Sequence, residues 1–284
     1  MKKETSKYPS FSVLMSVYKK ENPLFLDKAL ISLEQQTILP KEIVLVEDGI
    51  LTSELEKIII NHKNQRAVKY IIVRSSKNNG LASALHLGTK YVSTKWIARM
   101  DSDDYSVKNR FEKQLNVIND DSDLAVIGGQ INEFAHDIRN IVGNRIVPTT
   151  EHEIQKFIKW RNPFNHPTIM IRKDVLENVG GYLPFGNLED YYLWARVISA
   201  KYRTINIPDI LVHMRVDEGM YNRRGRIGNI KYFYRLRGYL RRKKIISPFE
   251  ELIGDIMMTS NIIIPSLIRK LLYQKVLHNN MNRK

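Results

Sequence analysis

Hydrophobic positions in the first half of the chain follow two alternating patterns. Short apolar runs rich in β-branched residues predict buried strands, and longer stretches with apolar residues every three or four positions predict helices. Strands that alternate with helices form βαβ units, so we expect an α/β fold with a mostly parallel, doubly wound sheet. The predicted strands are Phe11–Val17, Glu42–Val46, Val68–Val73, Trp96–Met100 and Leu124–Gly129, and Ser53 is the expected N-cap of the helix after the second strand.

The second half of the chain is less regular. Its patterns predict two helices and two strands, and from about Tyr221 they predict further helix with a break at Ser247-Pro248. The predicted helices are Glu151–Trp160 and Leu188–Ser199, and the predicted strands are His166–Arg172 and Leu211–Val216.

Composition narrows the class of protein. The chain has 284 residues, of which 43% are hydrophobic and 26% charged, as in ordinary soluble globular proteins. It contains no cysteine, which excludes a disulfide framework, a thiolate zinc site and a cysteine nucleophile. We expect no signal peptide, because the apolar run Phe11–Val17 is short and is followed by Lys19 and Lys20 without a small-residue cleavage site. We expect no membrane-spanning helix, because no apolar stretch reaches the roughly 18 residues that a span requires.

The net charge of +15 is concentrated at the C-terminal end. The segment Arg223–Lys284 holds fifteen Lys and Arg against three Asp and Glu, so the rest of the chain has a net charge of only +3. Two interpretations of this segment are open: an interfacial anchor on an anionic membrane, or a helical appendage packed on the body. Both interpretations rest on the same apolar pattern. It begins with five residues on one helical side, Tyr232, Phe233, Leu236, Tyr239 and Leu240, and continues at 262–272.

Residues at or just after the ends of the first four predicted strands are mostly polar. In a doubly wound sheet, ligands bind beyond the carboxyl ends of the strands, so these are candidate site residues. Taken singly they also have structural interpretations, with Tyr18 as a packing residue, Asp48-Gly49 as a turn and Asn79-Gly80 as a helix cap. In strand order they are Ser16, Val17 and Tyr18, then Asp48, then Asn79 and Gly80, and finally Asp101, Ser102, Asp103 and Asp104.

The run from Asp101 to Asp104 is the strongest single signal. Its three carboxylates repel one another unless a cation or hydrogen-bond donors lie between them. Hard oxygen ligands of this kind suit Mg²⁺ or Mn²⁺, especially where the metal also holds substrate phosphates. The alternative is a solvated, acidic helix N-terminus, where capping and the helix dipole favour Asp.

Five motifs occur in an order that matches the predicted strand ends: SVLMSVYKKEN, LVEDG, NNGLASALHLG, MDSDD and a late LEDYYLWAR. In this order they resemble family 2 glycosyltransferases of the GT-A, Rossmann-like fold, and bacterial capsule, exopolysaccharide and O-antigen enzymes look especially similar. The resemblance covers about 11–224. It implies a catalytic domain over 1–220, with a nucleotide-binding half over about 1–130 and an acceptor half over about 131–220. A basic helical region over 221–284 follows.

The resemblance also implies roles for single residues. Tyr18 would stack on a nucleobase, and Asp48 would accept from the uracil N–H. Asp101 would contact the ribose and Asp103 would hold the metal on the donor diphosphate, with Asp101 as a second metal ligand. Asp190 would be the catalytic base, with helix capping as the alternative role of Glu189-Asp190. The implied donor-binding residues are Ser16, Val17, Tyr18, Glu21, Asp48, Asn79, Gly80, Arg99, Asp101 and Ser102, and those of the acceptor side or a closing loop are Glu189, His166, Arg215, Arg223 and Arg224.

The implied activity is inverting, metal-dependent transfer of a hexose from a UDP-sugar to a glycan or lipid-linked saccharide, with Mn²⁺ or Mg²⁺ as cofactor. The implied place is the cytoplasm, on the inner face of the cell membrane. A sugar nucleotidyltransferase is an alternative, but it would use a glycine-rich loop after the first strand, and residues 16–22 contain no glycine. A nucleic-acid-binding protein that uses the basic tail is an alternative of another class, but it leaves the acidic strand ends unexplained.

Overall fold

The computed structural model describes residues 8–65, 67–216 and 230–263. The strands in this part of the chain are β1 Phe11–Val17, β2 Glu42–Asp48, β3 Lys69–Ser75, β4 Trp96–Arg99, β5 Tyr105–Ser106, β6 Leu124–Phe134, β7 Ile141–Arg145, β8 Met170–Arg172 and β9 Arg203–Arg215. They form one sheet in the order β3-β2-β1-β4-β8-β6-β9-β5, and β7 pairs with β6 beside this path.

The two halves of the sheet are built differently. β3, β2, β1 and β4 form an uninterrupted parallel set, as the alternation of strands and helices predicts. β8 then pairs antiparallel with both β4 and β6, while β9 runs parallel to β6. The long ladders are parallel and the short β5, β7 and β8 pair antiparallel. The predicted α/β fold with a mostly parallel sheet is therefore confirmed.

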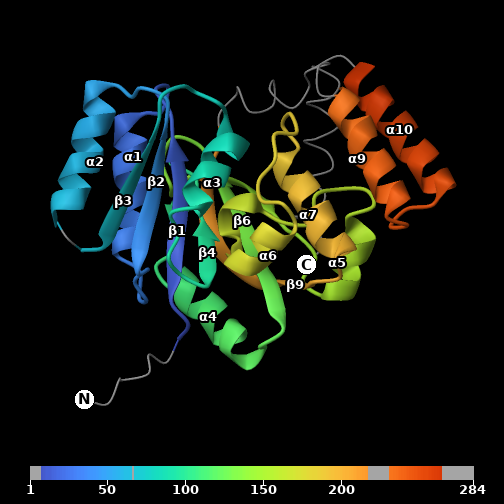
Figure 1. Ribbon diagram of the computed structural model, residues 1–284, viewed down its shortest axis with the longest axis horizontal. Coiled ribbons are helices and arrows are strands. Elements are labelled where there is room, and N and C mark those ends of the chain that lie inside the picture. Colours follow the sequence, from blue (N-terminus) through green and yellow to red (C-terminus); the bar gives the residue numbers. More distant parts are fainter. Residues whose placement is uncertain (1–7, 66, 217–229, 264–284) are drawn as a thin grey trace.

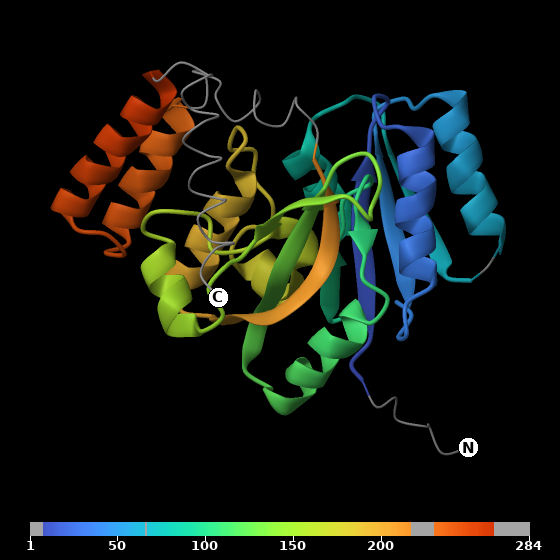
Figure 2. The same ribbon diagram turned by 180° about the vertical axis from the view of Figure 1, so that it is seen from behind.

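The helices are α1 Pro23–Glu34, α2 Ser53–Gln65, α3 Leu81–Thr89, α4 Arg110–Asp120, α5 Glu151–Phe157, α6 Lys173–Asn178, α7 Glu189–Ser199, α9 Ile230–Arg242 and α10 Pro248–Ile263. They cover both faces of the sheet (Figures 1 and 2). Residues of α1, α2 and α4 share one core with the strands, and residues of α3, α5, α6, α7 and α9 share a second core on the other face. α2 lies at one end of the molecule, and α9 and α10 lie at the other (Figure 1).

β1 shows how one strand serves both cores. Val13 and Met15 point into the core with α1, α2 and α4, whereas the intervening Leu14 points into the core with α3, as strand alternation requires. α3 lies so close to the sheet that a Cβ on Gly88 would sit 2.5 Å from Leu14 Cδ1 and 2.6 Å from Val46 Cγ2. This close packing fixes α3 against β1 and β2, whose carboxyl ends carry candidate site residues.

β6 and β9 are both longer than predicted. β6 continues through the glycine pair that marked its expected end, and β9 begins at Arg203 rather than at Leu211. The glycines let β9 approach β6, since a Cβ on Gly129 would sit 2.5 Å from Leu211 Cδ1. A pair of glycines that signals a turn in the sequence is here a close contact between two strands.

Two local predictions were wrong for identifiable reasons. Only Met170–Arg172 of the predicted strand His166–Arg172 is extended, because Pro167 lies in a 3₁₀ turn that precedes it. The expected cap at Ser53 is instead provided by Thr52, whose Oγ1 accepts from the backbone N–H of Leu55 at 3.4 Å.

α9 belongs to the packed body. Phe233, Leu236 and Leu240 are buried, and the last two join the core that α7 shares. This packing favours the appendage interpretation for α9 over the membrane one. The predicted break at Ser247-Pro248 is confirmed, because α9 ends before it and α10 begins at Pro248. Among the described residues, no helix is both long enough and apolar enough to cross a membrane. Side chains of the apolar stretch at 262–272 lie outside the described part.

Candidate active site

The residues Asp101–Asp104, which we call the acidic loop, follow β4 after one intervening residue, Met100. Arg99 ends β4 with a side chain that is only 2% exposed, and its guanidinium pairs with the carboxylate of Asp101. Ser102 donates from Oγ to the carboxylate of Glu21, which reaches the loop from the segment after β1. The loop is therefore tied to two neighbouring strand ends.

Arg215 supports the acidic loop from the end of β9. Its backbone N–H donates to Asp104 Oδ1 at 2.8 Å, and its Nε donates to the carbonyl oxygen of Asp103 at 3.3 Å. The guanidinium carbon lies 3.6 Å from the ring centroid of Phe25 and 4.6 Å from that of Phe134, and such cation–π contacts hold it in place. The resemblance implied an acceptor-side or closing-loop role for Arg215, and the structure places its side chain against the acidic loop.

The acidic loop is short of positive charge. Burial, followed by the charges of Asp101 and Glu21, raises the pKa of Asp103 to about 7. Burial and the same kind of repulsion raise the pKa of Asp104 well above its ordinary value. A divalent cation would relieve this repulsion, and carboxylate oxygens suit Mg²⁺ or Mn²⁺.

The described residues do not form a metal site by themselves. Among them, no three His, Cys, Asp or Glu side chains converge closely enough to hold a metal ion. Mg²⁺ in proteins is commonly bound by one or two carboxylates together with substrate phosphates and water. The acidic loop fits an ion of this kind, provided that a phosphate-bearing substrate completes the coordination.

Asp48 ties the segment before α3 to the end of β2. Its Oδ1 accepts from the backbone N–H of Asn79 at 2.9 Å, and its Oδ2 accepts from that of Gly80 at 3.0 Å. Gly80 is the N-cap residue of α3 but makes no side-chain cap, and its φ of 85° favours glycine. A Cβ at this position would meet nothing within 4 Å, so the backbone here is open to a ligand at a helix N-terminus.

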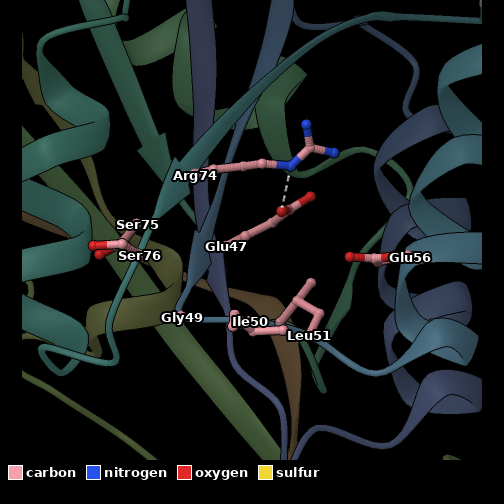
Figure 3. Close-up of a pocket in the computed structure, with 8 residues that line it drawn as sticks. All are labelled: Glu47, Gly49, Ile50, Leu51, Glu56, Arg74, Ser75 and Ser76. Carbon is pink, nitrogen blue, oxygen red and sulfur yellow. Dashed lines mark hydrogen bonds and ion pairs between the residues drawn. The ribbon is translucent and has the colours of Figure 1, made fainter.

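A pocket of about 330 Å³ lies at the ends of β2 and β3 (Figure 3). Arg74 Nε donates to Glu47 Oε2 at 2.8 Å within it, and Glu56 faces it from α2 (Figure 3). Glu47 stands where the resemblance expects the first Asp of a D-D-G pattern. Because successive side chains of a strand point to opposite sides, Glu47 lines this pocket, whereas Asp48 points toward the start of α3. The remaining lining residues are Gly49, Ile50, Leu51, Ser75 and Ser76.

A larger cavity of about 480 Å³ brings together residues that are far apart in the sequence. Arg99 and Asp101 reach it from the end of β4, and Glu189 and Asp190 reach it from the start of α7. Asp101, the first residue of the acidic loop, and the predicted base Asp190 therefore face one space. The other lining residues are Leu81, Arg145, Ile146, Val147, Phe157, Arg161, Asn162, Phe164, Asn165, His166, Pro167, Asn187 and Met214.

Glu189 and Asp190 are adjacent but differ in their partners. Asp190 Oδ2 accepts from Asn162 Nδ2 at 2.7 Å, and its Oδ1 accepts from the backbone N–H of Tyr191 at 2.7 Å. Glu189 Oε2 is buried and has no hydrogen-bond partner among the described residues. Burial, followed by the charge of Asp190, raises the pKa of Glu189 to about 7. Burial also raises the pKa of Asp190, against the opposing effect of its two hydrogen bonds. A carboxyl group with a pKa of about 7, as at Glu189, can exchange protons with a substrate near neutral pH.

Two arginines that the sequence did not single out line the same cavity. Arg145 ends β7, and its Nη2 donates to Glu133 Oε1 at 2.9 Å. Arg161 follows α5 and has no ion pair with a described residue; its guanidinium carbon lies 5.8 Å from the ring centroid of Phe157. Neither arginine lies in a recognisable motif, so only the fold reveals that they belong to the site.

His166 lines the cavity as an uncharged ring. It is 8% exposed, and its Nε2 lies 3.2 Å from the hydroxyl oxygen of Tyr182. Burial, followed by the charge of Arg99, lowers the pKa of His166 well below its ordinary value. His166 can therefore contribute hydrogen bonding and shape to an acceptor site, but not positive charge near neutral pH.

The remaining candidates lie apart from this cavity. Tyr18 follows β1 with 42% of its surface exposed, and Ser16 and Val17 precede it within the strand. These three residues line neither of the two cavities described above. Arg223 and Arg224 lie outside the described residues.

Comparison with known proteins identifies the family. A family model described as "Glycosyl transferase family 2" matches residues 12–180. The chain belongs to glycosyltransferase family 2. It is 39% identical to an uncharacterised glycosyltransferase of Haemophilus influenzae, over 94% of this chain and 98% of that protein. The amylovoran biosynthesis glycosyltransferase AmsE of Erwinia amylovora is 33% identical, over 93% and 98% of the two chains. An Escherichia coli UDP-Gal:alpha-D-GlcNAc-diphosphoundecaprenol beta-1,3-galactosyltransferase is 32% identical, over 95% and 97%.

Solved structures confirm the GT-A-like fold of this glycosyltransferase. The mannosyltransferase PcManGT of Pyrobaculum calidifontis, in complex with GDP-Man and Mn²⁺, has a TM-score of 0.67 at 14% identity, over 95% of this chain and 76% of that one. S. aureus TarS in complex with UDP-GlcNAc has a TM-score of 0.63 at 18% identity, over 97% and 76%. At these identities the likeness concerns the fold alone.

Proposed function

We propose that this glycosyltransferase moves a hexose from a UDP-sugar to a saccharide acceptor in bacterial surface polysaccharide biosynthesis, with inversion and with a divalent metal. The observation that carries the proposal is the one cavity that Asp101 shares with Glu189 and Asp190. A donor diphosphate at the first group and an acceptor hydroxyl at the second would meet in this space. The names of the relatives from Erwinia amylovora and Escherichia coli support the pathway class and a UDP-sugar donor.

The donor side uses residues at the strand ends. Asp101 and Asp103 would hold Mn²⁺ or Mg²⁺, which supplies positive charge to balance the donor diphosphate and the departing UDP. Tyr18 offers an exposed ring on which a base can stack. Asp48 already accepts two backbone hydrogen bonds, but a carboxylate has about four acceptor positions, so it can also accept from a uracil N–H.

Asp190 is the proposed catalytic base. It would take the proton of the acceptor hydroxyl while the hydroxyl oxygen attacks the anomeric carbon and the bond to the diphosphate breaks. Direct attack from the side opposite to the leaving group inverts the configuration without a covalent enzyme intermediate. Asn162 supports this role because its 2.7 Å hydrogen bond orients the Asp190 carboxylate. Glu189 would position the acceptor through its unpartnered oxygen.

The charges of the cavity support an acceptor that carries phosphate. Arg145 and Arg161 line it, and a guanidinium group matches phosphate oxygens in shape as well as charge. The name of the Escherichia coli relative gives a diphosphoundecaprenol-linked sugar as its acceptor. We therefore propose a lipid-linked saccharide diphosphate as the acceptor of this chain, met in the cytoplasm at the inner face of the membrane.

Thermal unfolding with a panel of nucleotides tests the donor assignment. UDP together with Mn²⁺ should raise the unfolding temperature more than UDP alone, Mn²⁺ alone or GDP with Mn²⁺, since a ligand stabilises only the state that binds it. Asp123→Asn, a change at an exposed aspartate outside both cavities, is the matched control and should leave this response intact. Equal stabilisation by GDP and UDP would contradict the uracil assignment, and a response independent of Mn²⁺ would contradict the metal assignment.

A further inference from the structure

α10 turns its acidic side toward the protein. Glu250 Oε1 accepts from Lys159 Nζ at 2.8 Å, and Lys159 follows α5. Glu251 Oε2 accepts from Arg241 Nη1 at 2.9 Å, and Arg241 lies on α9. The acidic residues at the start of α10 are therefore neutralised by contacts within the molecule.

Arg237 of α9 makes the central contact with α10. Its side chain is almost fully buried; Nε lies 3.3 Å from Asp255 Oδ1, and Nη1 donates to the carbonyl oxygen of Lys159 at 2.9 Å. A Cβ on Gly254 would sit 2.1 Å from the guanidinium carbon, so glycine is required for this approach. The polar side of α10 is thus fixed as its inner side.

The outer side of α10 is apolar where the structure describes its side chains. We call Phe249, Leu252, Ile256 and Met257 the apolar stripe; they are 70%, 57%, 58% and 61% exposed. Their spacing of three, seven and eight positions from Phe249 places them on one side of a helix. α10 is the outermost helix at its end of the molecule (Figures 1 and 2). This arrangement reverses that of an ordinary surface helix, and a continuous exposed apolar surface marks an interaction site.

Basic residues surround the apolar stripe. Arg242, Lys243 and Lys244, which end α9 and begin the turn toward α10, are exposed and have no acidic partner among the described residues. Because the three acidic residues of α10 face inward, the outer surface here is apolar and positively charged. This combination is typical of helices that lie in the interface of a membrane containing anionic lipids.

We propose that the apolar stripe of α10 docks on an anionic lipid surface, with the adjacent basic residues on the headgroups. The surface differs from the one that the sequence indicated, because α9 contributes charge while its apolar side stays in the core. Lys159 joins α10 to the end of α5, and Phe157 and Arg161 of the same stretch line the larger cavity. Docking therefore brings the cavity beside the membrane. The inference goes beyond the transfer reaction and does not depend on the donor assignment.

Vesicle flotation tests the docking surface directly. The full chain should float with vesicles of phosphatidylcholine and phosphatidylglycerol, and less with phosphatidylcholine alone or at high salt. The double variant Leu252→Ser/Ile256→Ser should bind anionic vesicles at least about tenfold more weakly, because two large apolar side chains no longer leave water. The matched control is Leu39→Ser/Ile60→Ser, since these residues are 46% and 50% exposed and line neither cavity.

A second measurement keeps the proposal testable if the double variant is poorly folded. Because the chain contains no cysteine, Ile256→Cys and Ile60→Cys can each carry one environment-sensitive fluorophore. Anionic vesicles should shift the emission of the Ile256→Cys label to the blue and leave that of Ile60→Cys unchanged. Absence of vesicle binding by the unmodified chain, equal binding by both double variants, or an unshifted Ile256→Cys label would overturn the proposal. So would a stripe-dependent dimer that forms in place of vesicle binding.

Discussion

Two acidic groups reach the larger cavity and differ in their surroundings: the acidic loop, through Asp101, and the start of α7, through Glu189 and Asp190. The acidic loop is held by neighbours on several sides, including Arg99 and Arg215, yet its carboxylates still repel one another. At the start of α7, Asp190 is oriented by Asn162, and one oxygen of Glu189 has no partner among the described residues. Burial raises pKa values in both groups. In the proposed reaction the first group would bind a cation, and the second would take a proton from the acceptor. The comparison shows how one type of side chain can be given two chemical roles by its environment.

The largest effect is expected when the acidic loop loses a charge. Asp103→Asn keeps the shape of the side chain but removes a proposed metal ligand, so transfer should fall by roughly 10³-fold, corresponding to several kcal/mol of transition-state stabilisation. Initial rates with and without Mn²⁺ measure the effect, and Asp123→Asn is the control. Near-normal Mn²⁺-dependent turnover by Asp103→Asn would contradict the proposed metal-binding role of the acidic loop.

Substitution of the proposed base at the start of α7 should lower turnover and leave donor binding unchanged. Asp190→Asn removes the proposed base without changing the size of the side chain, so turnover at saturating donor should fall at least about 10²-fold. Glu189→Gln, the matched change next to it, should mainly raise the Michaelis constant for the acceptor. If Glu189→Gln loses turnover and Asp190→Asn keeps it, the two roles are exchanged. If both variants keep turnover, the start of α7 carries no base.

Substitution of Arg215 tests whether this residue fixes the geometry of the acidic loop for metal binding. Arg215→Lys keeps the charge but loses the planar group packed on Phe25 and Phe134, so Mn²⁺ affinity should fall about tenfold as the loop loses its fixed geometry. Calorimetric titration of Mn²⁺ in the presence of UDP measures this, and the exposed Arg139→Lys is the control. An unchanged Mn²⁺ affinity together with a lower unfolding temperature would reduce Arg215 to a structural residue.

A third group of acidic residues differs from the other two because a histidine within the fold neutralises it. Asp27 and Glu34 on α1 both contact the ring of His62, at 3.0 Å and 2.9 Å. Burial disfavours the charged ring, but the hydrogen bonds and the negative charges of Glu34 and Asp27 together outweigh burial and raise the pKa of His62 above its ordinary value. The stability gained from protonated His62 is therefore complete below the unfolded pKa of about 6.5 and is lost as the pH rises through the higher folded pKa.

The smallest expected effect is the change of the thermal unfolding temperature with pH that protonation of His62 causes. The unfolding temperature should fall by a few degrees between about pH 6 and about pH 9, and His62→Gln should remove most of this difference. The exposed His152→Gln is the control and should keep the difference. A pH dependence that survives in His62→Gln would show that this acidic pair is not held by a charged histidine.

The sequence predicted the parallel half of the sheet well because each strand there is a short apolar run between amphipathic helices. It could not predict β5 and β7, whose pairing depends on β9 and β6 and not on local pattern. The strand-end residues were found from the topology of the sheet alone. Arg145 and Arg161 were missed because an isolated arginine carries no spacing signal, and only the fold brings them to the cavity.

The C-terminal helices show a different limit of sequence patterns. α9 and α10 both have an apolar side, and their sequences give no indication which of these sides is buried. The answer depends on Arg237, a positively charged residue that is buried between the two helices and binds the polar side of α10. Because buried Arg237 holds the polar side of α10 against α9, the apolar stripe of α10 faces outward.

Calorimetric titration of UDP into three proteins, with and without Mn²⁺, tests the central claim most directly. The claim is that the acidic loop binds the metal and the donor diphosphate, while Asp190 acts only on the acceptor. The account predicts Mn²⁺-dependent UDP binding by the unmodified chain, loss of that dependence in Asp103→Asn, and unchanged binding in Asp190→Asn despite its lost turnover. Mn²⁺-dependent binding that persists in Asp103→Asn, or that disappears in Asp190→Asn, would contradict it.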